Sequence, residues 1–152
     1  MATAILHADD DENDALLIRL ALTKAQLVVE LRRVRTGQEV LDCLCGVGVY
    51  ANRSRWPLPR LLLLDWNMPG LDGLGVLSWV RSSPSFRNLP VRIVSGADDP
   101  TARLQALSLG AAFVPKTSDF RSVADHVRSI LASNVMTWTR RFTPLRLIKL
   151  SD

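Results

Sequence analysis

The stretch that decides the fold class is residues 60–73, RLLLLDWNMPGLDG. Its four consecutive leucines predict a strand buried on both faces, because a half-exposed strand would alternate apolar with polar residues. Asp65 ends this apolar run, and Pro69 with Gly70 predicts a turn that leads the chain away from the strand. Gly73 permits a close approach of the backbone before a helix. We therefore expect a parallel sheet with helices on both faces.

The rest of the chain alternates in the same way between apolar segments bounded by turn residues and segments of helical period. Five strand–helix pairs follow one another, which predicts an α/β fold with a doubly wound, five-stranded parallel sheet. The predicted strands are residues 4–8, 27–34, 60–64, 91–94 and 112–114. The predicted helices are residues 12–24, 36–48, 74–82, 100–109 and 119–132.

Length and composition predict one compact domain, which we place at residues 1–133 of the 152, followed by an arm at residues 134–152. The arm holds four basic residues against one acidic residue, so it supplies +3 of the formal net charge of +4. The remainder is nearly neutral. A uniformly basic surface for binding nucleic acid is therefore not predicted.

The arm interleaves apolar residues with Arg and Lys, and Pro144 interrupts any continuous helix. It is too short to form a core of its own, so it either folds back on the domain or packs on another chain. We favour the second arrangement, a homodimer, because the five-stranded domain is complete without the arm. A third hypothesis, nucleic-acid binding by the arm, has few positive charges to support it. The residues assigned to the dimer arm are Trp138, Phe142, Leu145, Leu147 and Ile148.

Cysteine use and hydropathy predict a soluble cytoplasmic protein. Cys43 and Cys45 lie too close together on a predicted helix to form a disulfide framework, and no zinc-ligand cluster surrounds them. The N-terminus lacks a signal sequence, and no apolar run approaches the roughly 20 residues of a membrane span. His7 and His126 are expected to be structural residues, with His7 away from the acidic end of its strand.

Polar residues that could carry chemistry lie where the predicted strands end. Asp9 and Asp10 follow the first strand, Asp65 the third, Ser95 the fourth and Lys116 the fifth. In an open parallel sheet, ligands bind beyond the carboxyl ends of the strands. We therefore expect these five side chains to meet at one edge, although Asp10 could alternatively serve only as a helix cap.

Three carboxylates at one edge repel one another unless a cation lies among them. Mg2+ prefers oxygen ligands, and one or two carboxylates with a phosphate oxygen can complete its coordination. We therefore predict a Mg2+ site at Asp9, Asp10 and Asp65. Lys116 would place a positive charge beside a transferred phosphoryl group, and Ser95 would donate a hydrogen bond to it. A carboxylate that accepts a phosphoryl group is already ionised at neutral pH and needs no separate base.

Four segments, AILHADDDEND, LLLLDWNMPGLDG, VRIVSGADD and GAAFVPKTSDF, resemble in order and spacing the signature segments of response-regulator receiver domains. The resemblance covers about residues 4–133. It implies a flavodoxin-like, three-layer sandwich. It also implies a two-component protein that accepts a phosphoryl group on Asp65 from a histidine kinase. By this resemblance the chain would catalyse its own phosphorylation, could also catalyse its own dephosphorylation, and would not be a conventional enzyme.

The resemblance also assigns roles to residues beyond the phosphoacceptor. Asp9 and Asp10 match the acidic pair that holds Mg2+, and Asn67 matches the residue whose backbone carbonyl binds the same ion. Ser95 and Phe113 match the two switch residues of the family, which reposition after phosphorylation. Lys116 matches the family lysine.

More narrowly, the chain resembles the stand-alone receivers that accompany cyanobacterial and bacterial phytochromes. The resemblance rests on the long loop at residues 50–59, the segment SSPSFRNLPV and the ADD after Ser95. It implies a single-domain response regulator with a bacteriophytochrome-type kinase as partner, no output domain and a tendency to dimerise. Phosphorylation would change the affinity for a partner or for a second copy.

Two positions depart from the family pattern. Family members place Pro after the lysine, joined by a cis bond, whereas Pro115 here precedes Lys116 and Thr117 follows it. A cis bond before Thr117 would cost roughly 3 kcal/mol. Trp66 is a bulky neighbour for Asp65 and could screen it from water or from a partner. Both departures motivate an alternative hypothesis, a receiver-like interaction or dimerisation module that works without phosphorylation.

Overall fold

The computed structural model describes residues 2–96, 99–116 and 120–133. These ranges hold one five-stranded sheet with the strand order β2-β1-β3-β4-β5, in which every pairing is parallel. The strands are β1 (Thr3–Ala8), β2 (Val29–Val34), β3 (Leu61–Asp65), β4 (Val91–Ser95) and β5 (Ala112–Pro115). The helices are α1 (Glu12–Lys24), α2 (Gly37–Cys45), α3 (Gly73–Ser82), α4 (Pro100–Ser108) and α5 (Arg121–Ala132), with a short 3-10 helix η1 at Gly48–Ala51.

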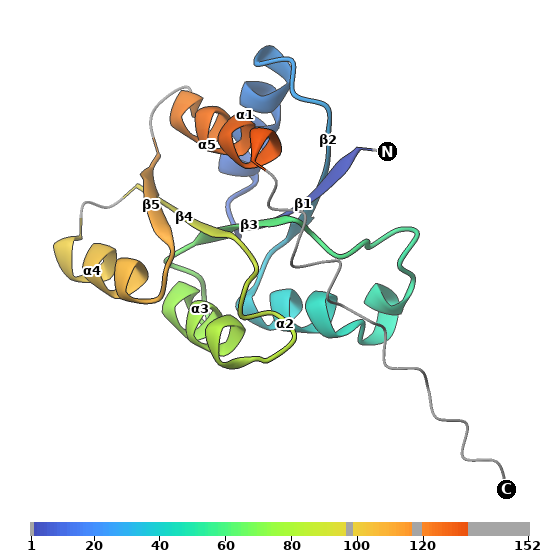
Figure 1. The fold of residues 1–152 in the computed structure, drawn as a ribbon, viewed down its shortest axis with the longest axis vertical. Coiled ribbons are helices and arrows are strands. Elements are labelled where there is room, and N and C mark those ends of the chain that lie inside the picture. Colours follow the sequence, from blue (N-terminus) through green and yellow to red (C-terminus); the bar gives the residue numbers. More distant parts are fainter. Residues whose placement is uncertain (1, 97–98, 117–119, 134–152) are drawn as a thin grey trace, which may run out of the picture.

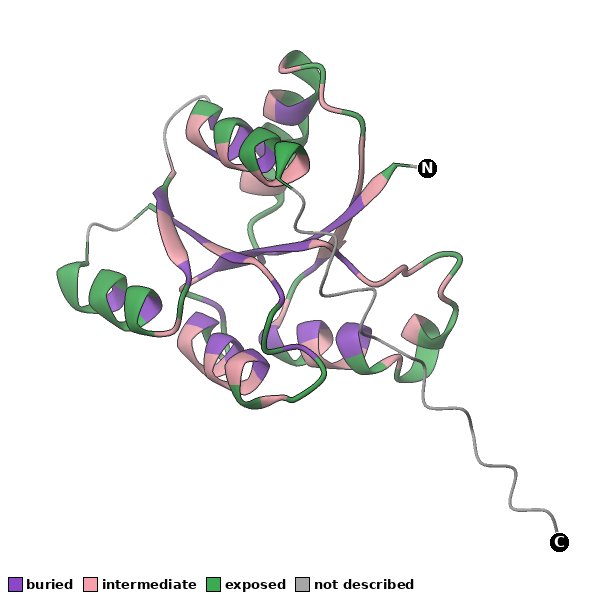
Figure 2. Cartoon of the chain, in the orientation of Figure 1, coloured by how far each residue is buried: buried purple, intermediate pink, exposed green. Residues whose placement is uncertain are grey.

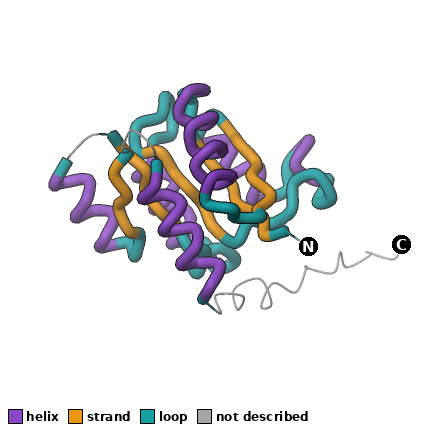
Figure 3. The backbone as a smooth tube through the Cα atoms, turned by 90° about the horizontal axis from the view of Figure 1, so that it is seen from above, coloured by secondary structure: helices purple, strands orange, loops and turns teal. Residues whose placement is uncertain are grey.

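The sheet forms the middle of three layers. Helices α1 and α5 lie side by side on one face, and α2, α3 and α4 cover the other (Figure 1). The view from above shows the same arrangement of the helices about the strands (Figure 3). The chain winds from β1 outward to β2 and then crosses to β3 on the other side of β1. The predicted doubly wound α/β fold is therefore confirmed, with its topological switch point between β1 and β3.

The leucine run of β3 explains why the sheet is buried on both faces. Leu62 and Leu64 belong to the apolar cluster beneath α2, α3 and α4, whereas Leu61 and Leu63 belong to the cluster beneath α1 and α5. Each of the four is almost fully buried, and the central strands are buried along most of their length (Figure 2). Burying one such side chain contributes about 1.5–3 kcal/mol. Strand β3 therefore anchors both layers and fixes the position of Asp65 at its end.

Helix α2 is shorter than the sequence predicts. It ends at Cys45 instead of residue 48, because Gly46 adopts a left-handed backbone with φ 69°. Arg53 donates hydrogen bonds to the carbonyls of Cys43 and Leu44 at the helix end, and the Cys43 carbonyl also accepts the N–H of Gly46. The β2 strand likewise begins at Val29 instead of residue 27.

Some predictions concern residues outside the described ranges. All five assigned residues of the dimer arm fall in residues 134–152. The peptide bond between Lys116 and Thr117 also falls outside the described ranges, because Thr117 does. The homodimer and the arm therefore stay predictions. Within the described ranges, none of the helices has the length and apolar character needed to cross a membrane.

Candidate metal centre

Three carboxylates meet at the switch point of the sheet. Asp9 and Asp10 directly follow β1, and Asp65 is the last residue of β3. Each offers a carboxylate oxygen that lies within 4.8 Å of the other two. Asp9 and Asp65 are buried, whereas Asp10 is exposed. The three carboxylates therefore lie close together, as their positions at the strand ends predict.

Asp11 is the residue that caps α1. Its Oδ1 accepts hydrogen bonds from the backbone N–H groups of Asn13 at 2.8 Å and Asp14 at 3.1 Å. Its own N–H donates to Oδ1 of Asp9 at 2.9 Å, which orients that buried carboxylate. The alternative in which Asp10 serves only as the helix cap is therefore wrong, because the neighbouring residue fills that role. The Asp10 carboxylate lies with those of Asp9 and Asp65, and we call these three residues the acidic cluster.

The Lys116 ammonium lies close to two of these carboxylates, those of Asp9 and Asp65, and to the carboxylate of Asp14. Its Nζ is 2.7 Å from Oδ2 of Asp14, 3.2 Å from Oδ2 of Asp9 and 3.7 Å from Oδ1 of Asp65. The Lys116 side chain is only 14% exposed. The backbone N–H of Lys116 donates to the carbonyl of Ser95 at 2.9 Å, so β4 holds the lysine at the end of β5. The structure thus brings Lys116 to the acidic cluster, as predicted.

The charges of the cluster perturb one another. Burial raises the pKa of Asp65 to about 6, and the nearby Asp9 and Asp10 add to the rise, although Lys116 opposes it. Burial also disfavours ionisation of Asp9, but the contact with His7, the N–H of Asp11 and the charge of Lys116 outweigh it and lower the pKa of Asp9 to about 2. One ammonium does not balance these carboxylates. Hard oxygen ligands with excess negative charge fit a divalent cation such as Mg2+.

The loop after Asp65 is held in place by close backbone packing. The N–H of Gly73 donates to the carbonyl of Trp66 at 2.9 Å. A Cβ at Gly73 would lie 2.7 Å from both the Asp65 carbonyl oxygen and the Trp66 Cα. A Cβ at Gly37, the first residue of α2, would likewise collide with the carbonyl oxygen of Leu71. The close approach predicted at Gly73 is therefore real, and it positions the start of α3 against Asp65.

The other predicted residues of this edge lie as follows. Asn67 is exposed, and its N–H donates to Oδ1 of Asp65 at 3.4 Å. Ser95 is buried at the end of β4, in register with Pro115 of β5. Phe113 is half-buried on β5 and packs against the core cluster under α4. The Arg103 guanidinium of α4 lies 5.4 Å from the centre of the Phe113 ring.

Two residues beside the site were missed by sequence reasoning. Asp14 looks like an ordinary acid in the first turn of a helix, and nothing in the sequence indicates that its side chain reaches Lys116. His7 was expected to lie away from the acidic end, but its Nε2 is 3.6 Å from Oδ2 of Asp9. His7 on β1 and Asp9, which directly follows that strand, point the same way because alternate residues of an extended chain do so. The His7 side chain is 1% exposed, and the described residues give its ring nitrogens no hydrogen-bond partner.

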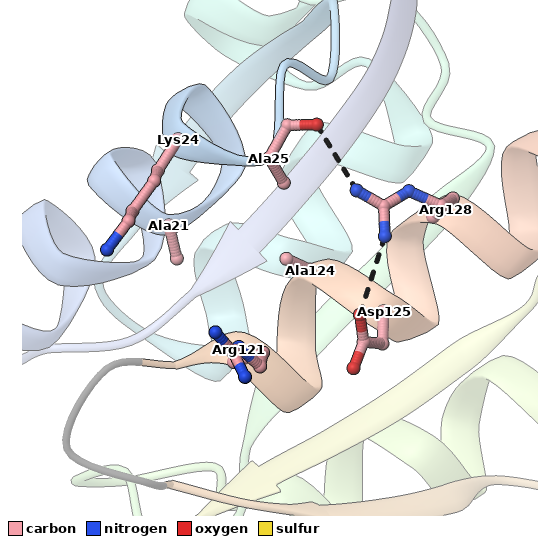
Figure 4. Close-up of a pocket in the computed structure, with 7 residues that line it drawn as sticks. All are labelled: Ala21, Lys24, Ala25, Arg121, Ala124, Asp125 and Arg128. Carbon is pink, nitrogen blue, oxygen red and sulfur yellow. Dashed lines mark hydrogen bonds and ion pairs between the residues drawn. The ribbon is translucent and has the colours of Figure 1, made fainter.

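A separate cavity of about 230 Å³ lies between α1 and α5 (Figure 4). Arg128 crosses its rim, donating to the carbonyl of Ala25 at 3.2 Å and pairing with Asp125 at 3.6 Å. None of its lining residues belongs to the acidic cluster, so this cavity is not part of the candidate metal centre. Its lining residues are Ala21, Lys24, Ala25, Arg121, Ala124, Asp125 and Arg128.

Comparisons with known proteins agree with this geometry. A model of the response regulator receiver domain matches residues 5–128. The response regulator PleD of Caulobacter vibrioides is 32% identical over 131 residues, which are 86% of this chain and 26% of PleD. The response regulator Rcp1 of Synechocystis sp. is 32% identical over 91 residues, which are 60% of each protein. The chain thus spans about a quarter of the length of PleD.

Solved structures of phytochrome response regulators resemble the chain over most of its length. The phosphorylated cyanobacterial phytochrome response regulator RcpA has a TM-score of 0.73 and 28% identity, over 86% of this chain and 91% of RcpA. The Mn2+-bound form of Rcp1 has a TM-score of 0.72 and 25% identity, over 89% of this chain and 96% of Rcp1. With the sheet order, the acidic cluster and the family match in agreement, the chain belongs to the response regulator receiver domain family.

Proposed function

We propose that this chain is a two-component response regulator in which Asp65 accepts a phosphoryl group from a histidine kinase. The observation that carries the proposal is the Asp65 carboxylate at the end of β3, within 4.8 Å of two further carboxylates and 3.7 Å from the Lys116 ammonium. Phosphoryl transfer depends mainly on positioning and on neutralisation of charge. A pKa of about 6 leaves Asp65 mostly ionised at neutral pH, so no separate base is required.

Asp9, Asp10 and Asp65, with the backbone carbonyl of Asn67, would hold the Mg2+ ion. When bound, the ion supplies positive charge to the phosphoryl oxygens and balances the acidic cluster. The Mn2+-bound structure of Rcp1 supports a divalent ion in such proteins. Lys116, which directly follows β5, would contribute a second positive charge.

Ser95 and Phe113 are the proposed switch residues. The Ser95 hydroxyl would donate a hydrogen bond to the phosphoryl group, and the Phe113 ring would change position with it. Because the Arg103 guanidinium of α4 lies over that ring, a movement of Phe113 would alter this contact and could shift α4. The surface formed by α4 and β5 would then change its affinity for a partner or for a second copy of the chain. The likeness to RcpA and Rcp1 supports a phytochrome-type histidine kinase as the donor.

Phosphorylation is tested by incubating the chain with Mg2+ and either acetyl phosphate or a phytochrome-type kinase, followed by intact-mass analysis. We expect one phosphoryl group on the wild type and none on Asp65→Asn. A chain that takes up no phosphoryl group from either donor would contradict the proposal. Uptake by Asp65→Asn to the same extent would place the acceptor elsewhere.

Mg2+ binding is expected to change the fluorescence of Trp66, which directly follows Asp65 and is half-buried. Asp10→Asn should weaken the Mg2+ affinity about tenfold or more, because it removes a charged oxygen ligand from the cluster. Titration of the metal-free protein followed by tryptophan emission measures this affinity. Trp66→Phe should abolish the signal while calorimetry still detects binding. An unchanged affinity in Asp10→Asn would exclude this residue from the site.

The alternative is an interaction module that works without phosphorylation. The bulky Trp66 beside Asp65 favours it, because an indole ring there could restrict access to the carboxylate. A protein without measurable Mg2+ affinity and without phosphoryl uptake would support this alternative over the proposed function.

A further inference from the structure

The closest acidic partner of Lys116 is Asp14, a residue of α1 outside the acidic cluster. The 2.7 Å contact between Lys116 Nζ and Asp14 Oδ2 is the length of a charge-assisted hydrogen bond. The 3.7 Å separation between Lys116 Nζ and Asp65 Oδ1 is too long for a hydrogen bond. Lys116 therefore interacts more strongly with α1 than with the carboxylate of β3.

Stabilisation of the helix does not account for this contact. Asp14 occupies the third position of α1, where an acidic side chain often turns back to the N-cap backbone. Here the N–H of Asp11 is taken by Asp9 instead. The Asp14 carboxylate reaches forward across to Lys116, a residue 102 positions later in the chain. Both partners are largely shielded from water, with side chains 14% and 24% exposed, so their attraction is only partly screened.

We propose that Asp14 is a positioning residue that draws the Lys116 ammonium away from Asp65, and so keeps the Asp65 carboxylate available to a divalent cation. The inference rests on the proposed metal site. An ammonium has three N–H donors, and Asp14 and Asp9 accept two of them. Without Asp14, the ammonium would settle on Asp65, because the attraction between opposite charges strengthens as they approach. It would then compete with Mg2+ for the same oxygens.

The test is the Mg2+ affinity of four proteins, measured by calorimetry with the metal alone. Asp14→Asn should bind Mg2+ about tenfold more weakly than the wild type, a typical effect of losing a partner just outside the metal ligands. Asp14→Glu should restore the affinity to within about twofold, because it keeps a carboxylate that can reach Lys116. Glu12→Gln is the matched control, since it removes an acid from the same helical turn that pairs with Arg35 instead of Lys116.

A double-mutant cycle separates positioning from simple attraction of the metal by a negative charge. In a Lys116→Met background, Asp14→Asn should have no further effect, because there is no ammonium to position. If the loss persists in that background, or if Asp14→Asn binds as the wild type does, the inference is overturned. A wild type that binds no Mg2+ overturns the metal site and this inference together. A wild type that binds Mg2+ but takes up no phosphoryl group contradicts only the proposed function.

Discussion

Asp65→Asn is expected to be more stable than the wild type by about 3 kcal/mol near neutral pH in the absence of metal. The reason is the pKa of Asp65, which burial raises from 3.8 to about 6. A rise of that size corresponds to roughly 3 kcal/mol of differential interaction between the two protonation states. Asp65 is 9% exposed, so solvent relieves little of this cost. An amide of the same shape carries no charge and avoids it.

The stability that Asp65→Asn gains over the wild type should increase as the pH rises. The folded protein holds its Asp65 proton up to about pH 6, whereas the unfolded chain releases it near 3.8. The wild type therefore loses stability as the pH rises through this window, relative to the variant. The difference should be complete above about pH 6 and vanish below about pH 4.

Urea denaturation at neutral and acidic pH, with a chelator present, measures the difference between the two proteins. Glu12→Gln serves as the control, because the exposed Glu12 side chain should give no comparable gain. Added Mg2+ should narrow the gap, since the ion binds the folded wild type and stabilises it by mass action. A variant that is no more stable than the wild type at neutral pH would contradict the pKa of about 6 for Asp65.

Gly73→Ala should destabilise the domain by about 3 kcal/mol and weaken Mg2+ binding at the same time. A Cβ at this position would lie 2.7 Å from two backbone atoms, the Asp65 carbonyl oxygen and the Trp66 Cα. Backbone cannot rotate away as a side chain can, so α3 and the loop must separate. Because the loop begins at Asp65, the acidic cluster is distorted as well.

Gly75→Ala, two residues later in the same helix, is the matched control. Its Cβ would meet the Cδ1 end of the Leu71 side chain, which can rotate, and alanine favours the helix. We expect a change within about 1 kcal/mol. Thermal or urea denaturation of both variants, with a Mg2+ titration, makes the comparison. Equal effects of the two substitutions would show that backbone contact at Gly73 is not the cause.

The sequence was sufficient for the parts of the structure that regular backbone geometry determines. The leucine run predicts a strand buried on both faces, and strand–helix alternation predicts a parallel sheet. Parallel strands end at the same edge, so Asp9, Asp10 and Asp65 had to converge once the strands were assigned. Lys116 follows the last strand and reached the same edge for the same reason.

The missed features depend on how helices sit on the sheet. The contact between Asp14 and Lys116 requires a particular rotation of α1 about its axis, which packing with α5 and the sheet determines. The end of α2 depended on Gly46 and on hydrogen bonds from the distant Arg53. Phe120 precedes α5 with a φ of 53°, a backbone conformation that an aromatic residue rarely adopts and that no sequence rule indicates.

The glycine at the start of α2 has a mechanical consequence. Gly37 brings α2 against the Leu71 carbonyl, and Gly73 brings α3 against Asp65. Both helices therefore pack closely against the loop between β3 and α3. Because these contacts leave no free space beside the loop, we expect that it cannot move toward α2 and α3 to make room for a phosphoryl group on Asp65. If Asp65 accepts a phosphoryl group as proposed, we expect the displacement to pass toward β4, β5 and α4, because Gly37 and Gly73 lack the Cβ atoms that would keep α2 and α3 away from the loop.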